Sequence, residues 1–260
     1  IMRNLINIFL FLPLLVCGQT IPDKKYHAGA EISKTYHGGV EVWSAASAFP
    51  LDDPDFVVSF YAEDLGADES AVATWPDRIG VNDATQGTGA NQPKVNVEAD
   101  GKKAVDFDGV NDGLSITEVI ALNFTPGNPI SLVIVTGQKA WGADQMALFK
   151  GNTSSSVTGL EYGFYASGID QLRGNIYGAN GTYGLKTASD VDVWIVNSNG
   201  STAELFKNGV SVSSWSVGTA DISSDIWIGS RLGTGKYFNG SIRAVGIANV
   251  LLDAGQLTAI

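Results

Sequence analysis

Apolar and polar residues alternate in short runs along most of this chain, and Gly, Asn, Asp and Pro separate the runs. An alternation of period two predicts strands with one buried face. Many strands without intervening helices predict an all-β fold, an antiparallel β-sandwich or jelly roll. The predicted strands cover residues 56–62, 94–97, 104–107, 113–116, 130–137, 161–166, 171–177, 191–198, 202–217, 225–230 and 236–249.

Three local patterns predict details of this fold: a hairpin turn, a buried sheet face and three core residues. Asn208-Gly209 inside the run 202–217 predicts a hairpin turn, because both central residues of such a turn need positive φ. In the stretch AVDFDGVNDGLSI (104–116), apolar residues alternate with polar ones and predict one buried sheet face. Trp75, Trp194 and Trp227 lie within strand patterns and are predicted to be core residues.

The N-terminus has the order of a secretory signal peptide. Arg3 precedes an apolar run at 5–16, and small residues follow it. We therefore expect a signal peptide over 1–18 and a secreted or surface-displayed protein; Pro13 and the short run argue against a membrane span. The alternative is a lipid anchor on Cys17, the one cysteine of the chain.

Residues 25–32 and 35–42 repeat the pattern Y-H-x-G-x-E-aliphatic at a spacing of ten. Each copy predicts a strand, a turn and a second strand, and residues 19–54 are thus expected to form a hairpin arm and linker, suited to self-assembly. His27 and His37 occupy equivalent positions, which a structural repeat explains more simply than a metal or proton-transfer role. Helical spacing at Leu251, Leu252, Leu257 and Ile260 predicts a helix that the sequence cuts short.

The composition narrows the classes of partner. The formal net charge is −11 and 44% of the residues are hydrophobic, which describes an acidic, well-packed globular chain. Nucleic acid binding needs a basic stripe, and none is visible in the sequence. Nucleic acids and anionic membranes are therefore not expected partners.

Four ordered blocks, residues 72–95, 104–116, 202–214 and 226–260, resemble bacterial and phage members of the laminin-G-like, concanavalin A-like lectin/glucanase superfamily. The resemblance implies a jelly roll over 55–260. It does not decide the function, because the fold carries lectins, adhesion modules, enzymes and spacers.

Calcium is the cofactor that the resemblance implies, since such domains often bind it at the sandwich rim. Oxygen-bearing side chains in loops are its usual ligands. The alternative is that these side chains only stabilise turns. The metal candidates are Asp77, Asp108, Asn111 and Asp112.

A glycan site needs aromatic rings beside polar groups. Aromatic residues in or beside Gly-rich loops are the candidates: Trp141, Tyr165, Tyr177, Tyr183 and Tyr237.

Catalysis finds little support in the sequence. Glycoside hydrolysis needs two carboxylates across one bond, and the nearest pattern, Glu98 and Asp100, is followed by lysines where a further Glu is needed. No histidine lies within 55–260. We therefore expect a non-catalytic module that binds glycan or protein partners; the alternative is a structural module of a surface appendage or phage particle.

Overall fold

A computed structural model describes residues 51–123, 127–137, 145–151, 191–217, 224–233, 235–253 and 256–257 with their side chains. It describes the backbone alone at residues 50 and 138 and in the strands 25–27, 30–37, 40–45, 161–166, 171–176 and 179–184. The chain forms two compact units, Ile1–Ala48 and Phe49–Ile260. No helix among the described residues is long and apolar enough to span a membrane.

The N-terminal unit contains a three-stranded antiparallel sheet in the order β1-β2-β3. These strands are β1 (Lys25–His27), β2 (Ala30–His37) and β3 (Val40–Ala45). The second strand of the first repeat copy continues into the first strand of the second copy, so two hairpins share β2. His27 pairs with Ala30 at one end of β2, and His37 pairs with Val40 at the other. At about 3.3 Å per residue the histidine backbones are about 23 Å apart along β2, too far for a shared metal ion.

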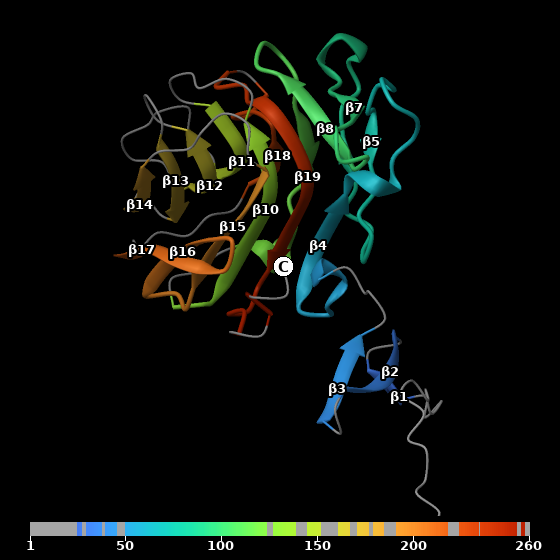
Figure 1. Ribbon diagram of the computed structural model, residues 1–260. Coiled ribbons are helices and arrows are strands. Elements are labelled where there is room, and N and C mark those ends of the chain that lie inside the picture. Colours follow the sequence, from blue (N-terminus) through green and yellow to red (C-terminus); the bar gives the residue numbers. More distant parts are fainter. Residues whose placement is uncertain are drawn as a thin grey trace, which may run out of the picture. The chain divides into compact units, whose positions relative to one another are not determined.

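The larger unit is an antiparallel β-sandwich, which confirms the predicted fold class (Figure 1). The first sheet has the order β17-β16-β15-β10-β19-β8-β7, and β4 also pairs with β19. Its strands are β4 (Phe56–Tyr61), β7 (Lys94–Val97), β8 (Lys103–Asp108), β10 (Ile130–Gln138), β15 (Val191–Ser198), β16 (Thr202–Lys207), β17 (Val210–Ser216) and β19 (Asn239–Ala248).

The second sheet has the order β14-β13-β12-β11-β18-β9-β6-β5. Its strands are β5 (Thr74–Trp75), β6 (Ala84–Thr85), β9 (Leu114–Ile116), β11 (Gln145–Gly151), β12 (Glu161–Ala166), β13 (Gln171–Ile176), β14 (Ala179–Gly184) and β18 (Ile226–Ile228). The remaining elements are single 3₁₀ turns at Pro50–Asp52, Ala62–Asp64, Gly89–Asn91 and Ile120–Leu122. The chain crosses between the sheets several times, for example from β8 to β9 and from β17 to β18, as in a jelly roll.

The inner core lies between the two sheets and contains the alternating residues of 104–116. Val105, Phe107, Leu114 and Ile116 are all buried there, as the sequence predicts. Trp75 and Trp194 are fully buried in the same core, whereas Trp227 is only half-buried and is not part of it. The prediction of a core position is therefore wrong for Trp227. Since Trp227 alternates with the core residues Ile226 and Ile228, its side chain lies on the other face of β18.

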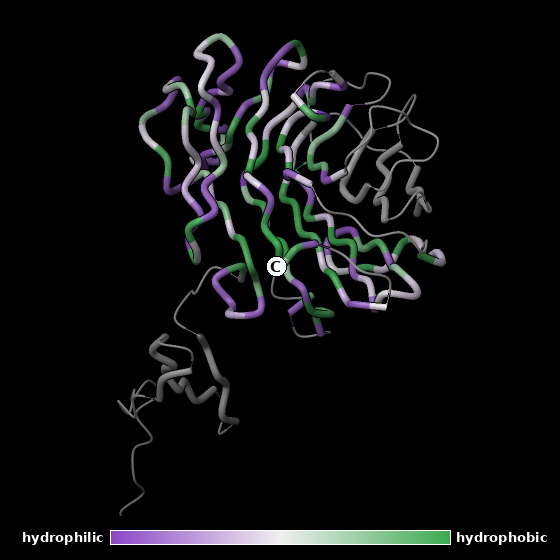
Figure 2. Tube along the Cα trace, turned by 180° about the vertical axis from the view of Figure 1, so that it is seen from behind, coloured by the Kyte–Doolittle hydropathy of each residue, from purple (hydrophilic) through white to green (hydrophobic). Residues whose placement is uncertain are grey.

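A second hydrophobic cluster covers the outer face of the first sheet. It joins residues of β4, β10, β15 and β19 to Leu252 in the segment that follows β19. Figure 2 shows the hydrophobic strands at the centre of the sandwich with polar turns around them. The first sheet is therefore apolar on both faces, and Val250, Leu252 and Leu257 of the C-terminal segment pack on its outer face.

Candidate functional site

The acidic stretch between β8 and β9 is a turn whose carboxylates accept hydrogen bonds from their own backbone. Asp108 Oδ1 accepts the N–H groups of Val110 at 2.7 Å and Asn111 at 3.2 Å. Asp112 Oδ2 accepts the N–H of Asp108 at 2.9 Å. Gly109 has φ +77°, a conformation that favours glycine. These bonds give the cluster a structural role in reversing the chain.

Asn111 connects this turn to a neighbouring loop, and Asp112 is its buried carboxylate. Asn111 Nδ2 donates to Ala90 O at 2.9 Å and to Asn91 Oδ1 at 3.1 Å, which attaches the turn to a neighbouring loop. Burial raises the pKa of Asp112; the hydrogen bond from Asp108 N–H opposes the increase, and the charges of Asp108 and Asp106 add to it. The turn therefore holds one carboxylate that is costly to ionise.

Asp77 is buried and stabilises a different loop. Its Oδ1 accepts the N–H groups of Ser59 on β4 at 3.0 Å and Ile79 at 3.4 Å. Its Oδ2 accepts the backbone and side-chain N–H groups of Asn82, both at 3.2 Å. Both oxygens are thus occupied by donors of the protein itself.

Within the part of the chain that the structure describes, no three His, Cys, Asp or Glu side chains are grouped as metal ligands would be. The structure therefore does not join Asp77, Asp108 and Asp112 into one three-carboxylate site. Calcium binding by these residues and Asn111 stays a prediction.

The predicted aromatic site is only partly within the described residues. Trp141 and Tyr177 lie outside them, and Tyr165 on β12 and Tyr183 on β14 are described by their backbone alone. Tyr237 is half-buried, and its hydroxyl donates to Gly233 O at 3.0 Å. Tyr237 thus stabilises the loop before β19.

The carboxylates Glu98 and Asp100 share one cation. Arg243 Nε donates to Glu98 Oε2 at 2.6 Å, and Arg243 Nη1 lies 2.8 Å from Asp100 Oδ2. Ser241 Oγ donates to Glu98 Oε1 at 2.7 Å. The Lys102 N–H, with help from Arg243, lowers the pKa of Asp100. Asp100 therefore favours the ionised form, and both carboxylates are held in an ion pair with Arg243.

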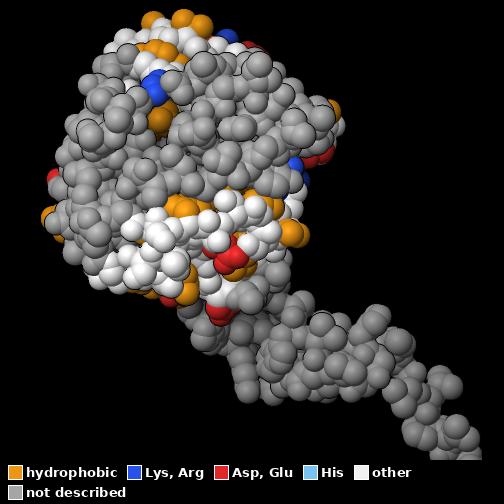
Figure 3. All heavy atoms as spheres, turned by 90° about the vertical axis from the view of Figure 1, so that its left-hand side faces the viewer, with side chains coloured by type: hydrophobic (Ala, Val, Ile, Leu, Met, Phe, Trp, Pro, Cys, Tyr) orange, Lys and Arg blue, Asp and Glu red, His pale blue; other side chains and the backbone are white. Residues whose placement is uncertain are grey.

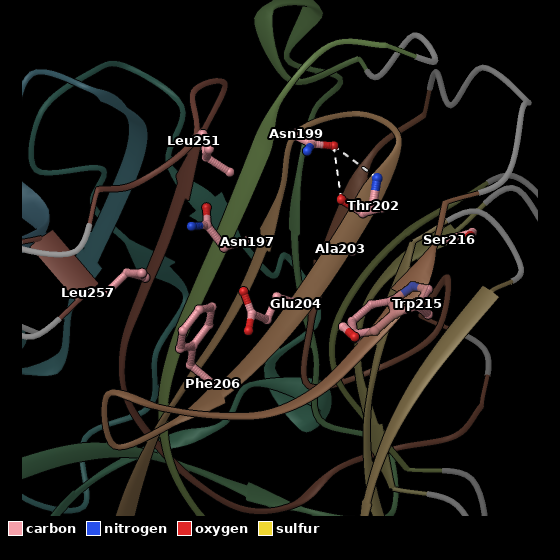
Figure 4. Close-up of a pocket in the computed structure, with 11 residues that line it drawn as sticks. Asn197, Asn199, Thr202, Ala203, Glu204, Phe206, Trp215, Ser216, Leu251 and Leu257 are labelled. Atoms are coloured by element: carbon pink, nitrogen blue, oxygen red, sulfur yellow. Dashed lines mark hydrogen bonds between the residues drawn. The ribbon is translucent and has the colours of Figure 1, made fainter.

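A hollow that the described residues form lies on the outer side of the first sheet, over β15, β16 and β17. Its volume is about 700 Å³, within the usual range for small-molecule sites. Figure 4 shows the side chains around it. Its lining consists of Asn197, Asn199, Thr202, Ala203, Glu204, Phe206, Ser214, Trp215, Ser216, Leu251 and Leu257.

The alternation of side chains along β16 directs polar and aromatic groups toward this hollow. On β16, Ala203 and Leu205 are buried in the inner core, so Glu204 and Phe206 face outward. Glu204 pairs with Ser214 on the neighbouring edge strand β17. Asn208 and Gly209, with φ +49° and +77°, form the hairpin turn that joins the two strands, as predicted.

A turn at the other end of β16 closes the hollow. Asn199 Oδ1 accepts the N–H groups of Ser201 and Thr202, both at 2.9 Å, and lies 3.3 Å from Thr202 Oγ1 (Figure 4). This turn leaves the side-chain amide Nδ2 of Asn199 without a hydrogen-bond partner among the described residues.

The C-terminal segment supplies the opposite wall. Asn197 Nδ2 donates to Leu252 O at 2.9 Å, and Leu252 N–H donates back to Asn197 Oδ1 at 3.0 Å. Ser131 Oγ lies 2.7 Å from Val250 O. These buried bonds hold the segment on the sheet, and Leu251 and Leu257 then line the hollow (Figure 4).

Unused hydrogen-bonding groups distinguish this hollow from the acidic turn. Ser211 Oγ donates to Glu204 Oε1, while Glu204 Oε2 has no partner among the described residues. The exposed hydroxyls of Ser214 and Ser216 likewise have none there. Figure 3 shows this side of the sandwich, where polar atoms are mixed with hydrophobic and acidic side chains. The hollow thus combines open polar groups with the half-buried ring of Phe206.

Sequence reasoning did not find this site. The pattern of residues 202–217 predicts a hairpin but does not indicate a ligand site. The spacing of the C-terminal leucines predicts a helix. One available indication was the polar face of the run, where Glu204 and several serines alternate with apolar residues. Nothing in the sequence indicated that Leu251 and Leu257 would lie opposite that face.

Comparison with known proteins supports the fold and no single family. No family model matches the chain, and no curated protein matches it. Among solved structures, Trypanosoma rangeli sialidase in complex with sialic acid is similar, with 13% identity and a TM-score of 0.59. That match covers 91% of this chain but 43% of the sialidase chain, so this chain spans less than half of that protein.

The binding domain of botulinum neurotoxin DC is also similar. In complex with SialylT it has 11% identity and a TM-score of 0.52, covering 80% of this chain and 51% of that one. In complex with rat synaptotagmin II it has 10% identity and a TM-score of 0.50, with the same coverage. These likenesses show that the chain has a β-sandwich fold, which both groups of structures share. The finer assignment to the concanavalin A-like superfamily stays a resemblance.

The expectation that the chain is not an enzyme is corrected by these comparisons. The sialidase structures are similar with TM-scores of 0.59 and 0.58, so the fold occurs in a glycoside hydrolase. A missing strand motif and missing histidines exclude only two catalytic arrangements, since two carboxylates from different strands can also flank a glycosidic bond. A shared fold at 13% identity does not transfer the activity, but the exclusion of catalysis no longer stands.

Proposed function

We propose that residues 49–260 form a glycan-recognition module, secreted or displayed at a cell or virion surface, and that the hollow over β15–β17 is its binding site. The supporting comparisons are the sialidase in complex with sialic acid and the toxin domain in complex with SialylT. The signal-peptide pattern of residues 1–18 supports the location.

The observation that carries the proposal is the chemistry of the hollow. Sugars present hydroxyl groups on their edges and C–H groups on their faces. Glu204 Oε2, the hydroxyls of Ser214 and Ser216 and the amide of Asn199 are available to the hydroxyl groups. The ring of Phe206 is available to a sugar face. A hollow with convergent polar groups and an apolar wall is the usual form of a small-ligand site.

A glycan array tests the proposal with a variant that fills the hollow. Ser214 is exposed and outside the core, so Ser214→Trp should add a side chain to the hollow without disturbing packing. Val81→Trp is the matched control, because Val81 is 92% exposed and not part of the hollow. We expect the wild type and Val81→Trp to bind the same glycans and Ser214→Trp to lose them. Equal binding by all three proteins would contradict the proposed site.

The same samples should be tested for turnover, because the structural likeness includes sialidases. Mass spectrometry of the bound glycans would reveal a released sugar. Turnover by the wild type and its absence in Ser214→Trp would place the reaction in this hollow.

A structural role is the second proposal, and the N-terminal sheet favours it. Strands β1 and β3 are both edge strands in the order β1-β2-β3, and edge strands can pair with another chain. We propose that this sheet connects copies of the protein. Deleting residues 19–50 should then convert an oligomer into a monomer in light scattering while the melting temperature stays within a few degrees. A monomer before and after the deletion would contradict this role.

A further inference from the structure

We infer that the hollow over β15–β17 selects uncharged oligosaccharides and rejects acidic ones, and that Glu204 is the residue that makes this distinction. The inference rests on the proposed function and names its ligand class. It separates this chain from the structures that share its fold, two of which hold sialic acid or SialylT.

The lining of the hollow carries a negative charge. Glu204 is the one ionisable side chain among the described residues that line the hollow. A bound carboxylate would therefore lie near a like charge with no lysine or arginine from this lining to compensate it. Placing like charges together at a binding site is an effective means of rejecting a ligand.

The charges nearby do not reverse this balance. Lys207 is the nearest cation along β16, but it pairs with Asp192 at 3.4 Å and lies over the ring of Trp194. Trp194 belongs to the inner core, so Lys207 is directed away from the hollow. Beside the wall residue Leu257, Gln256 Nε2 donates to two further carboxylates, Asp53 and Asp55, at 3.1 and 3.0 Å. Together with the net charge of −11, these groups keep the region acidic.

The hollow also offers a ligand one hydrogen-bond acceptor on Glu204. Glu204 Oε2 is an acceptor without a partner among the described residues, because Ser211 binds the other oxygen. A sugar hydroxyl can donate to it, and a hydrogen bond to an ionised acceptor is stronger than one between neutral groups. An ionised sugar carboxylate has no proton to donate. The hydroxyl of a neutral sugar can therefore donate to Glu204 Oε2, whereas an ionised carboxylate in the same position leaves this oxygen without a donor.

The test is an array of neutral oligosaccharides, each printed with its sialylated form and with its amine-bearing, de-N-acetylated form where one exists. The strongest pair is then titrated by calorimetry in 0.05 M and 0.5 M salt. We expect the neutral member to bind at least about tenfold more tightly than the sialylated one, and the ratio to decrease at high salt because ions screen the repulsion. Amine-bearing forms should bind at least as tightly as neutral ones.

Two variants assign the effect to Glu204. Glu204→Gln keeps the size of the side chain and removes its charge, so it should weaken binding of the neutral glycan about threefold to tenfold and reduce the neutral-to-sialylated ratio. Glu69→Gln removes one charge far along the chain, on an exposed side chain that pairs with Lys94, and should change neither value. Circular dichroism should show both variants folded.

Three outcomes are informative. Equal or tighter binding of the sialylated member overturns the inference and leaves the proposed glycan site intact. A ratio that Glu204→Gln does not change overturns the role of Glu204. No binding of any array member at millimolar concentration overturns the proposed function, and the inference with it.

Discussion

Two polar regions of this protein differ in how many of their hydrogen-bonding groups have partners within the protein. In the acidic turn between β8 and β9, the hydrogen bonds of Asp108 and Asp112 run to the turn's own backbone. In the hollow over β15–β17, Glu204 keeps one oxygen free of partners among the described residues. A dense group of carboxylates can thus be purely structural, whereas unused donors and acceptors facing open space indicate a ligand site.

The largest stability effect should come from Asp77. Asp77→Ala removes a buried acceptor and leaves the N–H groups of Ser59, Ile79 and Asn82 without it. Since an unsatisfied buried donor costs about 1–3 kcal/mol, the free energy of unfolding should fall by about 2–4 kcal/mol. Urea unfolding at pH 7 measures it. A loss below 0.5 kcal/mol would contradict this structural role of Asp77.

Lys150 should give the second largest effect on stability, and this effect should depend on pH. It is fully buried, its Nζ donates to Ser224 O, and burial lowers its pKa to about 8. The folded state therefore binds this proton less tightly than the unfolded state, so stability should rise as the pH increases from about 8 to the ordinary value near 10.4.

Lys150→Met should remove this rise and stabilise the protein at pH 7 by about 1–3 kcal/mol, because a hydrophobic side chain of similar size avoids burying a charge. Unfolding curves at pH 7 and pH 10 measure both effects. Destabilisation at pH 7 would mean that the bond to Ser224 outweighs the cost of burial.

Substitution of Asp108 tests whether the acidic turn has a structural role alone or also binds calcium. Asp108→Ala should cost about 0.5–2 kcal/mol, since it removes the acceptor for the N–H groups of Val110 and Asn111. Millimolar Ca²⁺ should then leave the melting temperature of the wild type unchanged. A calcium-dependent rise that Asp108→Ala abolishes would instead establish the predicted metal site, because a ligand of the folded state stabilises it by mass action.

The smallest effect is expected at Asp112. Burial raises the pKa of the Asp112 carboxyl in the folded state. The protonated carboxyl therefore contributes to the stability of the folded state fully below its ordinary pKa of about 3.9. This contribution is lost as the pH rises through the raised pKa. Asp112→Asn can still accept the N–H of Asp108 and carries no charge. It should be as stable as the wild type at pH 3 and slightly more stable at pH 7, which differential scanning calorimetry measures.

The sequence predicts the sandwich well where strands alternate regularly. Val105, Phe107, Leu114 and Ile116 are buried as their pattern requires. Strand β11 was not predicted, because Lys150 is buried where alternation favours an apolar residue and the strand has an irregularity between Met146 and Leu148. Strand β14 was also missed, since its Asn-Gly sequence is typical of a turn.

The candidate site is harder to predict than the fold. Its polar groups lie on the hairpin of β16 and β17, but its far wall comes from Leu251 and Leu257, some forty residues later. A buried bond network between Asn197 and Leu252 brings them together, and no local pattern encodes that contact. Carboxylate clusters are visible in a sequence, whereas only the three-dimensional structure shows that Glu204 Oε2 has no hydrogen-bond partner among the described residues.

A crystal structure of the protein with the strongest array glycan tests the central claim most directly. The account predicts sugar density in the hollow, with a sugar hydroxyl on Glu204 Oε2 and a sugar face on Phe206. Density at the acidic turn near Asp108, or against the aromatic loops while the hollow holds only water, would contradict it.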